Sequence, residues 1–523
     1  MRIASWRSGI GLLLVVFTVT ACGGESRSAT DEPAGRPNII LMMADDLGWG
    51  DTSFNGHPHL KTPSLDGMAA NGLVMNRFYS AAPVCSPTRA SVLTGRHPFR
   101  DRIFFATAGV SKLALPPQQY SLAPLFDEAG YRTGFFGKWH LGSMTREVAD
   151  GRLGGNPAYV HLYSPPWEHG FETVFATESR VPTYDPMVRP RNQGGPDARS
   201  MPAEIIDKTA VRGWWLPLEN PEDGMPWGTQ YWNGAGEPAA GEFRGEDSRI
   251  IIDEVIRFVE AQKEDSRPFI AVVWFHTPHL PLVAGDDDRA AYAEHDFYDR
   301  TYYAAVSALD REIGRLREAL SDQGVADNTV LWFTSDNGPE GLAGRQPGRT
   351  GGLRERKRSL YEGGIRVPGI IEWPAHIDAG RTTGAPAVTS DILPTILGWA
   401  GTELLPGHLI DGIDIDPIVT GAVAERGVPI GFESQNQLAW IDDRYKLIHG
   451  TRVPEAMFGQ NKATELKFEL YDIVNDPGET IDIASQHPDI VARMTLELED
   501  WRASVAASIE NGGEGLAATP RDE

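Results

Sequence analysis

The stretch that decides the fold is Asn38-Ile39-Ile40-Leu41-Met42-Met43-Ala44-Asp45-Asp46. Its apolar run is continuous rather than alternating, which is typical of a strand buried on both faces of a parallel sheet. Two acidic residues follow at once, at the point where the strand ends. Because open α/β sheets bind ligands outside the carboxyl ends of their parallel strands, this stretch predicts a central strand and part of a site.

Three further apolar runs lead in the same way into polar residues: Gly134-Phe135-Phe136 into Lys138-Trp139-His140, residues 269–275 into His276 and His279, and residues 330–333 into Asp336-Asn337. Helical patterns such as residues 302–320 separate the runs. We therefore predict an α/β fold with a large, mixed but mostly parallel sheet sandwiched by helices. If the four strands are neighbours, their polar ends share one crevice.

Taken singly, each polar group has a simpler explanation, since Asp and Asn are common turn residues and a lone histidine is usually structural. The repetition at four strand ends makes a shared site the better interpretation. Its acidic and amide members offer only oxygen, which suits calcium or magnesium and disfavours zinc or copper. The sequence thus predicts a hard-cation site made by Asp45, Asp46, Asp336 and Asn337.

Length and composition exclude several classes of protein. The 523 residues, 41% hydrophobic and 23% charged, fit one large globular domain plus a smaller one and exclude wholesale disorder. The net charge of −24 disfavours nucleic acid as a partner. Two cysteines exclude a disulfide scaffold and a zinc site built on paired cysteines.

The first 21 residues have the layout of a secretory signal peptide, with Arg2, Arg7 and an apolar run over residues 10–19. The following Val19-Thr20-Ala21-Cys22 resembles a bacterial lipobox, which implies a lipid on Cys22 and an exported lipoprotein, periplasmic or on the bacterial cell surface. An ordinary cleaved signal, with Cys22 a spare thiol or paired to Cys85, is the alternative. Residues 22–36 are predicted to be a flexible tether.

The second cysteine begins a stretch that resembles a loop entering a helix. Pro87 lies where the first turn would be, and Gly95 follows the last turn. At such a helix N-terminus, backbone amides and the helix dipole lower a thiol pKa, so Cys85 is a candidate reactive residue. A buried small residue is the simpler alternative.

Cys85-Ser86-Pro87-Thr88-Arg89, continued by Ala-Ser-Val-Leu-Thr-Gly-Arg, resembles the signature of the type I, formylglycine-dependent sulfatases of the alkaline phosphatase superfamily. Further motifs match the family in order along the chain: residues 36–40 with 45–48, Gly137-Lys138-Trp139-His140-Leu141-Gly142, Thr277-Pro278-His279, Ser335-Asp336-Asn337-Gly338 and residues 361–368. The resemblance covers nearly the whole expected fold.

The resemblance implies that a maturation enzyme oxidises Cys85 to formylglycine, whose hydrate attacks sulfur with one hydroxyl on the metal. It implies calcium, with magnesium possible, on Asp45, Asp46, Asp336, Asn337 and the modified Cys85. Arg89 would hold the hydrate, aided by Lys138, which would also contact the sulfate, and by His140, which would take the proton. His279 would contact the sulfate and the leaving oxygen, with Lys357 nearby. The implied reaction is hydrolysis of sulfate monoesters with release of inorganic sulfate.

Two stretches bear on the substrate. Residues 345–358 hold six basic residues and one acid, which suggests an anionic substrate such as a sulfated polysaccharide fragment; a solvated basic loop fits equally well. Residues 143–247 form a Gly/Pro-rich insertion whose aromatic residues could stack on sugars or simply pack it: Trp167, Tyr184, Trp214, Trp215, Trp227, Tyr231 and Trp232.

We predict a catalytic domain over residues 37–415, including the insertion, then a small subdomain over 416–510 and a frayed tail over 511–523. Short strands at residues 428–432, 437–441, 445–448 and 469–473, with a helix over 490–507, indicate an antiparallel sheet plus helix. Two other functions stay open: a phosphonate or phosphate ester hydrolase with the same site, and a non-catalytic lipoprotein that binds sulfated glycans if Cys85 is unmodified.

Overall fold

The computed structural model describes residues 35–107, 113–117, 121–190, 216–218, 220–234, 236–341, 347–402, 404, 408–450 and 467–510. The predicted signal peptide, Cys22 and the tail 511–523 lie outside this part of the chain. The fold belongs to a compact unit that begins at Arg36. None of the described helices combines the length and apolar character needed to cross a bilayer.

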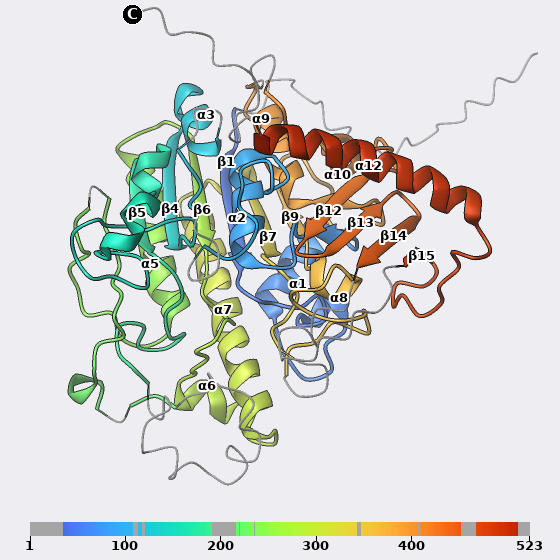
Figure 1. The fold of residues 1–523 in the computed structure, drawn as a ribbon. Coiled ribbons are helices and arrows are strands. Elements are labelled where there is room, and N and C mark those ends of the chain that lie inside the picture. Colours follow the sequence, from blue (N-terminus) through green and yellow to red (C-terminus); the bar gives the residue numbers. More distant parts are fainter. Residues whose placement is uncertain are drawn as a thin grey trace, which may run out of the picture. The chain divides into compact units, whose positions relative to one another are not determined.

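The described residues form a central sheet with eight strands in the order β10-β2-β9-β7-β1-β6-β4-β5 (Figure 1). The strands are β1 (Asn38–Ala44), β2 (Leu73–Met75), β4 (Arg132–Lys138), β5 (Thr173–Thr177), β6 (Phe269–Trp274), β7 (Thr329–Ser335), β9 (Ile370–Glu372) and β10 (Arg381–Thr383). The strands predicted from the four apolar runs, β7, β1, β6 and β4, are consecutive neighbours and run parallel. Only β9 runs antiparallel to its neighbours, so the predicted mixed sheet is confirmed.

Strand β1 is buried on both faces because its side chains alternate between two apolar layers. Ile39, Leu41 and Met43 belong to one core, which the helices α2 (Cys85–Thr94), α3 (Leu122–Glu128) and α9 (Ile392–Trp399) complete. Ile40 and Met42 belong to the other core, which α1 (Pro63–Asn71), α5 (Asp247–Glu260) and α7 (Phe297–Asp322) complete. This two-sided burial explains why the sequence of β1 is continuously apolar.

The helices are α1 (Pro63–Asn71), α2 (Cys85–Thr94), α3 (Leu122–Glu128), α5 (Asp247–Glu260), α6 (Asp286–Ala290), α7 (Phe297–Asp322), α8 (Glu362–Ile365), α9 (Ile392–Trp399), α10 (Asp416–Val419) and α12 (Pro488–Glu510). Short 3₁₀ turns are η1 (Ser53–Asn55), η2 (Pro157–Leu162), η3 (Pro166–His169), η5 (Pro221–Asp223), η6 (Ala261–Lys263), η7 (Ala326–Asn328) and η8 (Thr389–Asp391).

Two smaller sheets flank the central one. The strands β11 (Ala387–Val388), β3 (Phe78–Tyr79) and β8 (Arg366–Val367) form the first. The second is antiparallel and consists of β12 (Ile430–Ser434), β13 (Gln437–Ile441), β14 (Tyr445–Gly450) and β15 (Phe468–Asp472). Helix α12 crosses this sheet (Figure 1) and buries Met494 and Leu498 against Trp440, Leu447 and Leu470. The predicted C-terminal sheet and helix are therefore confirmed.

Candidate active site

The carboxyl ends of the parallel strands bring the predicted site residues together. Asp45 and Asp46 follow β1, Lys138 ends β4, and Asp336 follows β7. The strand ends are tied by backbone hydrogen bonds, because the Asp336 amide donates to Ala44 O at 3.1 Å and the Asp45 amide donates to Thr277 O at 3.1 Å. The side chains that follow the strands are held in one buried cluster.

The backbone turns sharply at the strand ends. Asp46 and His140 take left-handed conformations, with φ of 71° and 58°. Gly137 has φ of 98°, and a Cβ at this position would lie 2.0 Å from Trp274 O, so only glycine fits here. Residues held in sparsely populated backbone conformations cluster at functional sites. The strain thus coincides with the predicted site.

Three cations pair with three carboxylates in the cluster. Lys138 Nζ lies 2.6 Å from Asp45 Oδ2, and Lys357 Nζ lies 2.5 Å from Asp46 Oδ1. Arg89 Nη2 lies 2.7 Å from Asp336 Oδ2, and its guanidinium lies 5.0 Å from the centre of the Trp274 ring. Burial raises the pKa values of Asp45 and Asp46, whereas the three cations outweigh burial at Asp336 and lower its pKa.

The cluster retains oxygens that accept no hydrogen bond: Asp45 Oδ1, Asp46 Oδ2 and Asn337 Oδ1, all buried. Leaving one buried acceptor unsatisfied costs about 1–3 kcal/mol. Asp45, Asp46, Cys85 and His279 each offer an atom within 4.8 Å of the others'. A hard divalent cation would satisfy these oxygens, so the residues fit the predicted metal.

Cys85 is the first residue of α2 and is buried, with its Sγ 3.6 Å from Lys357 Nζ. The helix ends at Gly95 in the left-handed conformation, as predicted. The prediction of a lowered thiol pKa is wrong: burial raises the pKa of Cys85 to about 12, and Asp336 adds to the rise. Desolvation outweighs the helix N-terminus and the nearby lysines. The unmodified thiol is therefore a poor nucleophile.

His140 and His279 lie at the catalytic cluster, whereas His276 lies away from it in a hydrogen-bonded position of its own. Burial and the nearby Lys138 hold the pKa values of His140 and His279 well below the usual range, so both imidazoles are neutral. His279 Nε2 lies 3.7 Å from Asp46 Oδ2. His276 is fully buried between Asp247 Oδ2, at 2.7 Å, and Thr177 Oγ1, at 2.8 Å, so its role is structural.

Sequence reasoning missed Glu340, whose Oε2 lies 3.4 Å from Lys357 Nζ. Glu340 also pairs with Arg358 at 2.5 Å, and its backbone oxygen accepts a hydrogen bond from Arg356. Arg354 lies 3.8 Å from the centre of the Tyr361 ring. These members of the basic run are engaged within the protein, and a role of the run in binding an anionic substrate stays a prediction. Arg345 lies outside the described residues.

The described aromatic residues of the insertion serve mainly to pack it. Tyr231 and Trp232 are buried, and Trp232 Nε1 donates to Asp150 Oδ2 at 2.8 Å. Trp227 Nε1 donates to Arg180 O at 3.1 Å, and Trp167 Nε1 donates to the Tyr163 hydroxyl at 3.1 Å. Trp214 and Trp215 lie outside the described residues.

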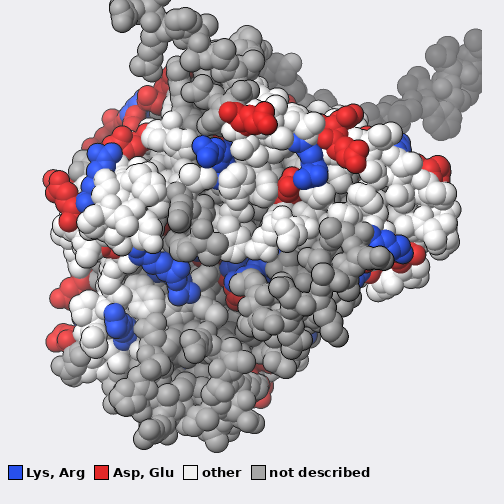
Figure 2. Space-filling view, viewed as in Figure 1, with Lys and Arg blue, Asp and Glu red and all other residues white. Residues whose placement is uncertain are grey.

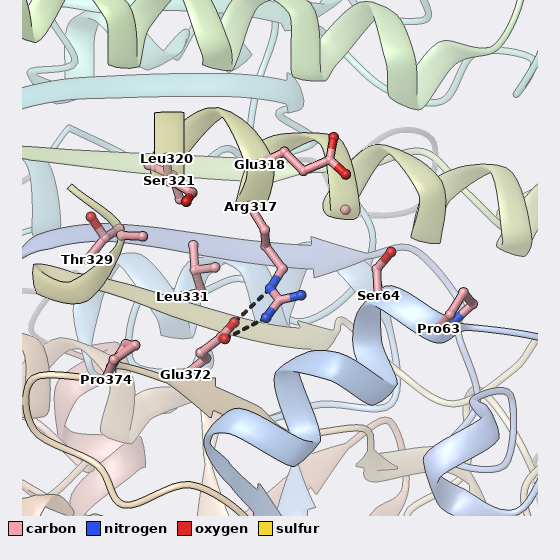
Figure 3. A pocket seen from close by; sticks show the side chains of 12 residues that line it. Pro63, Ser64, Arg317, Glu318, Leu320, Ser321, Thr329, Leu331, Glu372 and Pro374 are labelled. Atoms are coloured by element: carbon pink, nitrogen blue, oxygen red, sulfur yellow. Dashed lines mark hydrogen bonds and ion pairs between the residues drawn. The ribbon is translucent and has the colours of Figure 1, made fainter. Parts of the chain in front are cut away.

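A separate pocket lies between α1, α7 and β9 (Figure 3). Its lining includes Thr329 at the start of β7, at the opposite end of that strand from Asp336. Arg317 points into the pocket and pairs with Glu372 at 2.6 Å (Figure 3). None of the described side chains that line this pocket leaves a buried polar atom without a hydrogen bond, in contrast to the cluster at the strand ends.

An α/β sheet whose strand ends surround a buried cysteine with carboxylates, cations and neutral histidines defines a hydrolase of anionic esters. The model of the sulfatase family matches residues 37–402. The chain belongs to this family, within the alkaline phosphatase superfamily, and is a sulfuric ester hydrolase.

Several characterised proteins are similar to the chain along most of its length. Human arylsulfatase A is 29% identical over 512 residues, which cover 92% of this chain and 90% of the relative. Pig N-acetylgalactosamine-6-sulfatase is 32% identical over 419 residues, 77% of this chain and 69% of the relative. The crystal structure of Ps i-CgsB with k-i-k-neocarrahexaose superposes with a TM-score of 0.71, at 26% identity, covering 89% of this chain and 92% of that one.

Proposed function

We propose that this sulfatase acts through a formylglycine made from Cys85 and a divalent cation, calcium or magnesium, on sulfate esters of carbohydrates. The observation that supports this most strongly is that Cys85 lies with Asp45 and Asp46 in a group whose potential ligand atoms are within 4.8 Å of one another, while one buried oxygen of each aspartate accepts no hydrogen bond. The raised pKa of the unmodified thiol argues in the same direction, because a buried, protonated thiol needs conversion before it can attack.

In this proposal a maturation enzyme oxidises Cys85 to an aldehyde, which adds water. One hydroxyl of the hydrate attacks sulfur, and the bond from sulfur to the alcohol oxygen breaks. His140, neutral in the structure, then takes the proton of the second hydroxyl, and inorganic sulfate departs as the aldehyde forms again. A cation held by Asp45, Asp46, Asp336, Asn337 and residue 85 supplies positive charge to the reacting oxygens.

The remaining cations orient and stabilise the transferring group. Arg89, fixed by Asp336, supports the hydrate, and Lys138 lies where it can contact sulfate oxygens. His279 and Lys357 lie on the side of Asp46 and serve the leaving oxygen. Of these two, Lys357 is protonated in the substrate-free structure, since Asp46 outweighs burial and holds the lysine pKa well above its usual value.

Two relatives support a carbohydrate substrate. One is named for the 6-sulfate of N-acetylgalactosamine, and the other was crystallised with neocarrahexaose. We further propose that a lipid on Cys22 anchors the enzyme outside the cytoplasm, at the periplasmic face or cell surface of a bacterium. In that setting, degradation of sulfated polysaccharides is the process it serves.

Turnover of three aryl esters by protein from its native host tests this function. We expect release of inorganic sulfate from an aryl sulfate, with much weaker hydrolysis of the phosphonate and phosphate analogues. The Cys85→Ala variant should lose turnover by roughly 10⁴-fold or more. Faster hydrolysis of the phosphonate would favour the phosphonate esterase, and glycan binding without any turnover would favour the binding lipoprotein.

A further inference from the structure

Arg180 is a half-buried cation near the site that the catalytic chemistry does not use. It follows β5, whose last residue, Thr177, pairs in register with Lys138 at the end of β4. Within the described part of the chain, the Arg180 guanidinium makes no hydrogen bond or ion pair. Asp45, Glu340 and Asp46 attract its charge without forming an ion pair, and burial still lowers the pKa of Arg180. An anionic partner at hydrogen-bond distance would therefore stabilise the guanidinium.

The backbone places Arg180 between the segments that carry the two histidines. On one side, the amide of His140 donates to Glu178 O at 2.9 Å. On the other side, Thr183 Oγ1 donates to Val283 O at 2.6 Å, and the Thr183 amide donates to Pro281 O at 3.3 Å, just beyond His279. Residues 178–183 therefore span the edge of the site from His140 to His279.

A second arginine is held at the same edge. The buried carboxylate of Glu178 accepts backbone amides of Arg152, Leu153 and Gly154 at 2.7, 3.0 and 3.0 Å. Burial, Lys138 and Lys357 lower the pKa values of His140 and His279, and smaller contributions come from Arg152 at His140 and from Arg180 at His279. Figure 2 shows Lys and Arg side chains reaching the surface in the middle of the molecular face in view, although the net charge is −24.

We propose that Arg180 binds a second anionic group of the substrate, a carboxylate or a second sulfate close to the scissile sulfate. This inference rests on the proposed function and narrows its substrate class to carbohydrates with at least two anionic groups. The guanidinium suits either anion, because its planar fork matches two oxygens at once. In the proposed mechanism Lys138 contacts the sulfate that is cleaved and Lys357 serves the leaving oxygen, which leaves Arg180 for another group.

The test measures kcat/KM of formylglycine-containing enzyme on four substrates: an aryl sulfate, a monosulfated hexosamine, a disulfated hexosamine, and the monosulfated hexosamine joined to a uronic acid. The measured quantity is the ratio of each dianionic substrate to the monosulfated hexosamine. In Arg180→Gln we expect one or both ratios to fall roughly 10- to 100-fold, because loss of a charge-assisted hydrogen bond to the substrate weakens binding by about this factor. A fall confined to the disulfated sugar identifies a sulfate, and one confined to the uronate identifies a carboxylate.

The matched control is Arg189→Gln, an exposed arginine of the same insertion, which should leave both ratios unchanged. Arg180→Lys keeps the charge without the fork and should give an intermediate ratio. Thermal unfolding of each variant separates misfolding from lost recognition. Ratios in a folded Arg180→Gln within about two-fold of wild type would overturn the inference, as would weaker hydrolysis of all four substrates by the same factor.

Binding separates this inference from the proposed function. In a Cys85→Ala background, which cannot turn over, calorimetry with the disulfated and uronate-linked sugars should show the same loss on Arg180→Gln. Absence of turnover in the wild type together with this loss of affinity would refute the sulfatase mechanism but retain the anion site. Normal turnover without the loss would refute the anion site alone.

Discussion

Two of the buried clusters of charged side chains in the described part of the chain differ in how well the oxygens of their carboxylates are paired with donors and cations. The catalytic cluster consists of Asp45, Asp46, Arg89, Lys138, Asp336, Asn337 and Lys357. The second, the Lys446 cluster, consists of Tyr79, Glu362, Arg366, Lys446 and Glu479. In the catalytic cluster three oxygens accept no hydrogen bond, although each carboxylate already pairs with a cation.

The Lys446 cluster has a cation or donor for each of its carboxylates. Lys446 Nζ lies 3.0 Å from Glu362 Oε1 and 2.8 Å from Glu479 Oε1. Glu362 Oε2 accepts the Tyr79 hydroxyl at 3.0 Å, and Glu479 Oε2 accepts the Glu362 amide at 2.7 Å. Glu479 Oε1 makes no hydrogen bond but has the Lys446 ammonium at 2.8 Å, whereas Arg89 and His279 lie 3.7 Å from Asp45 Oδ1 and Asp46 Oδ2. Buried oxygens without a cation or donor at hydrogen-bond distance, rather than buried charge as such, therefore distinguish the predicted cation site from a cluster that joins two parts of a fold.

The Lys446 cluster joins the C-terminal sheet to the catalytic part of the chain. Lys446 lies on β14, Glu362 begins α8, and Tyr79 lies on β3. The segment before α8 includes Lys357, whose amide donates to Pro339 O at 3.2 Å. The antiparallel sheet therefore supports the loop that positions a candidate catalytic residue.

The largest expected effect is the loss of bound metal and of turnover when a carboxylate of the catalytic cluster is changed. Asp45→Asn keeps the shape of the side chain but removes a charge from the catalytic cluster. We expect metal content after dialysis and turnover to fall by roughly 100-fold or more, since even partners of metal ligands contribute 10- to 100-fold. Asp310→Asn is the control, because that buried carboxylate caps α1 through the amides of Ser64 and Leu65. Equal metal content in Asp45→Asn and wild type would contradict the assignment.

The second effect concerns the stability of the Lys446 cluster. Lys446→Met leaves Glu362 and Glu479 buried with too little positive charge. We expect the free energy of unfolding to fall by about 3–5 kcal/mol, measured by urea titration. The exposed Lys467 provides the control, and Lys467→Met should change stability by less than about 0.5 kcal/mol. A similar small change in Lys446→Met would show that the cluster does not hold the sheet in place.

The smallest effect is a pH dependence within the Lys446 cluster. Burial, reinforced by Glu362, raises the pKa of Glu479 from 4.5 to about 7 despite Lys446. Between these values the folded protein holds a proton that the unfolded chain has lost, so this contribution to stability is present at low pH and disappears as pH rises through 7.

Glu479→Gln stays neutral at every pH and tests this linkage. Relative to wild type, the variant should gain stability from pH 5 to pH 8, by an amount on the order of 1–3 kcal/mol. Chemical denaturation at both pH values measures it. A difference between variant and wild type that is the same at pH 5 and pH 8 would mean that Glu479 is ionised throughout this range.

The central strands could be predicted from the sequence, because each one has a recognisable local pattern. The runs before Asp45, Lys138 and Asp336 predicted the central strands, because burial on both faces demands continuous apolar sequence. Because these strands lie in one group of parallel neighbours, the polar residues that follow them lie close together. The two-residue strands β3, β8 and β11 escaped prediction, since so short a segment has no periodicity to read.

Features that depend on tertiary burial could not be predicted. The thiol pKa of Cys85 moves opposite to expectation because the whole helix N-terminus is desolvated. Arg180 and Glu340 stand in loops without a recognisable spacing, although both follow strands of the central sheet. Glu362 and Lys446 meet across 84 residues of sequence, and no local pattern signals that contact.

Mass spectrometry of the peptide containing Cys85, from protein made in its native host, tests most directly whether residue 85 works as formylglycine. We expect the aldehyde or its hydrate at this position, together with aryl sulfate turnover by the same preparation. An unmodified thiol in folded, metal-loaded protein that still hydrolyses the ester would refute the formylglycine mechanism.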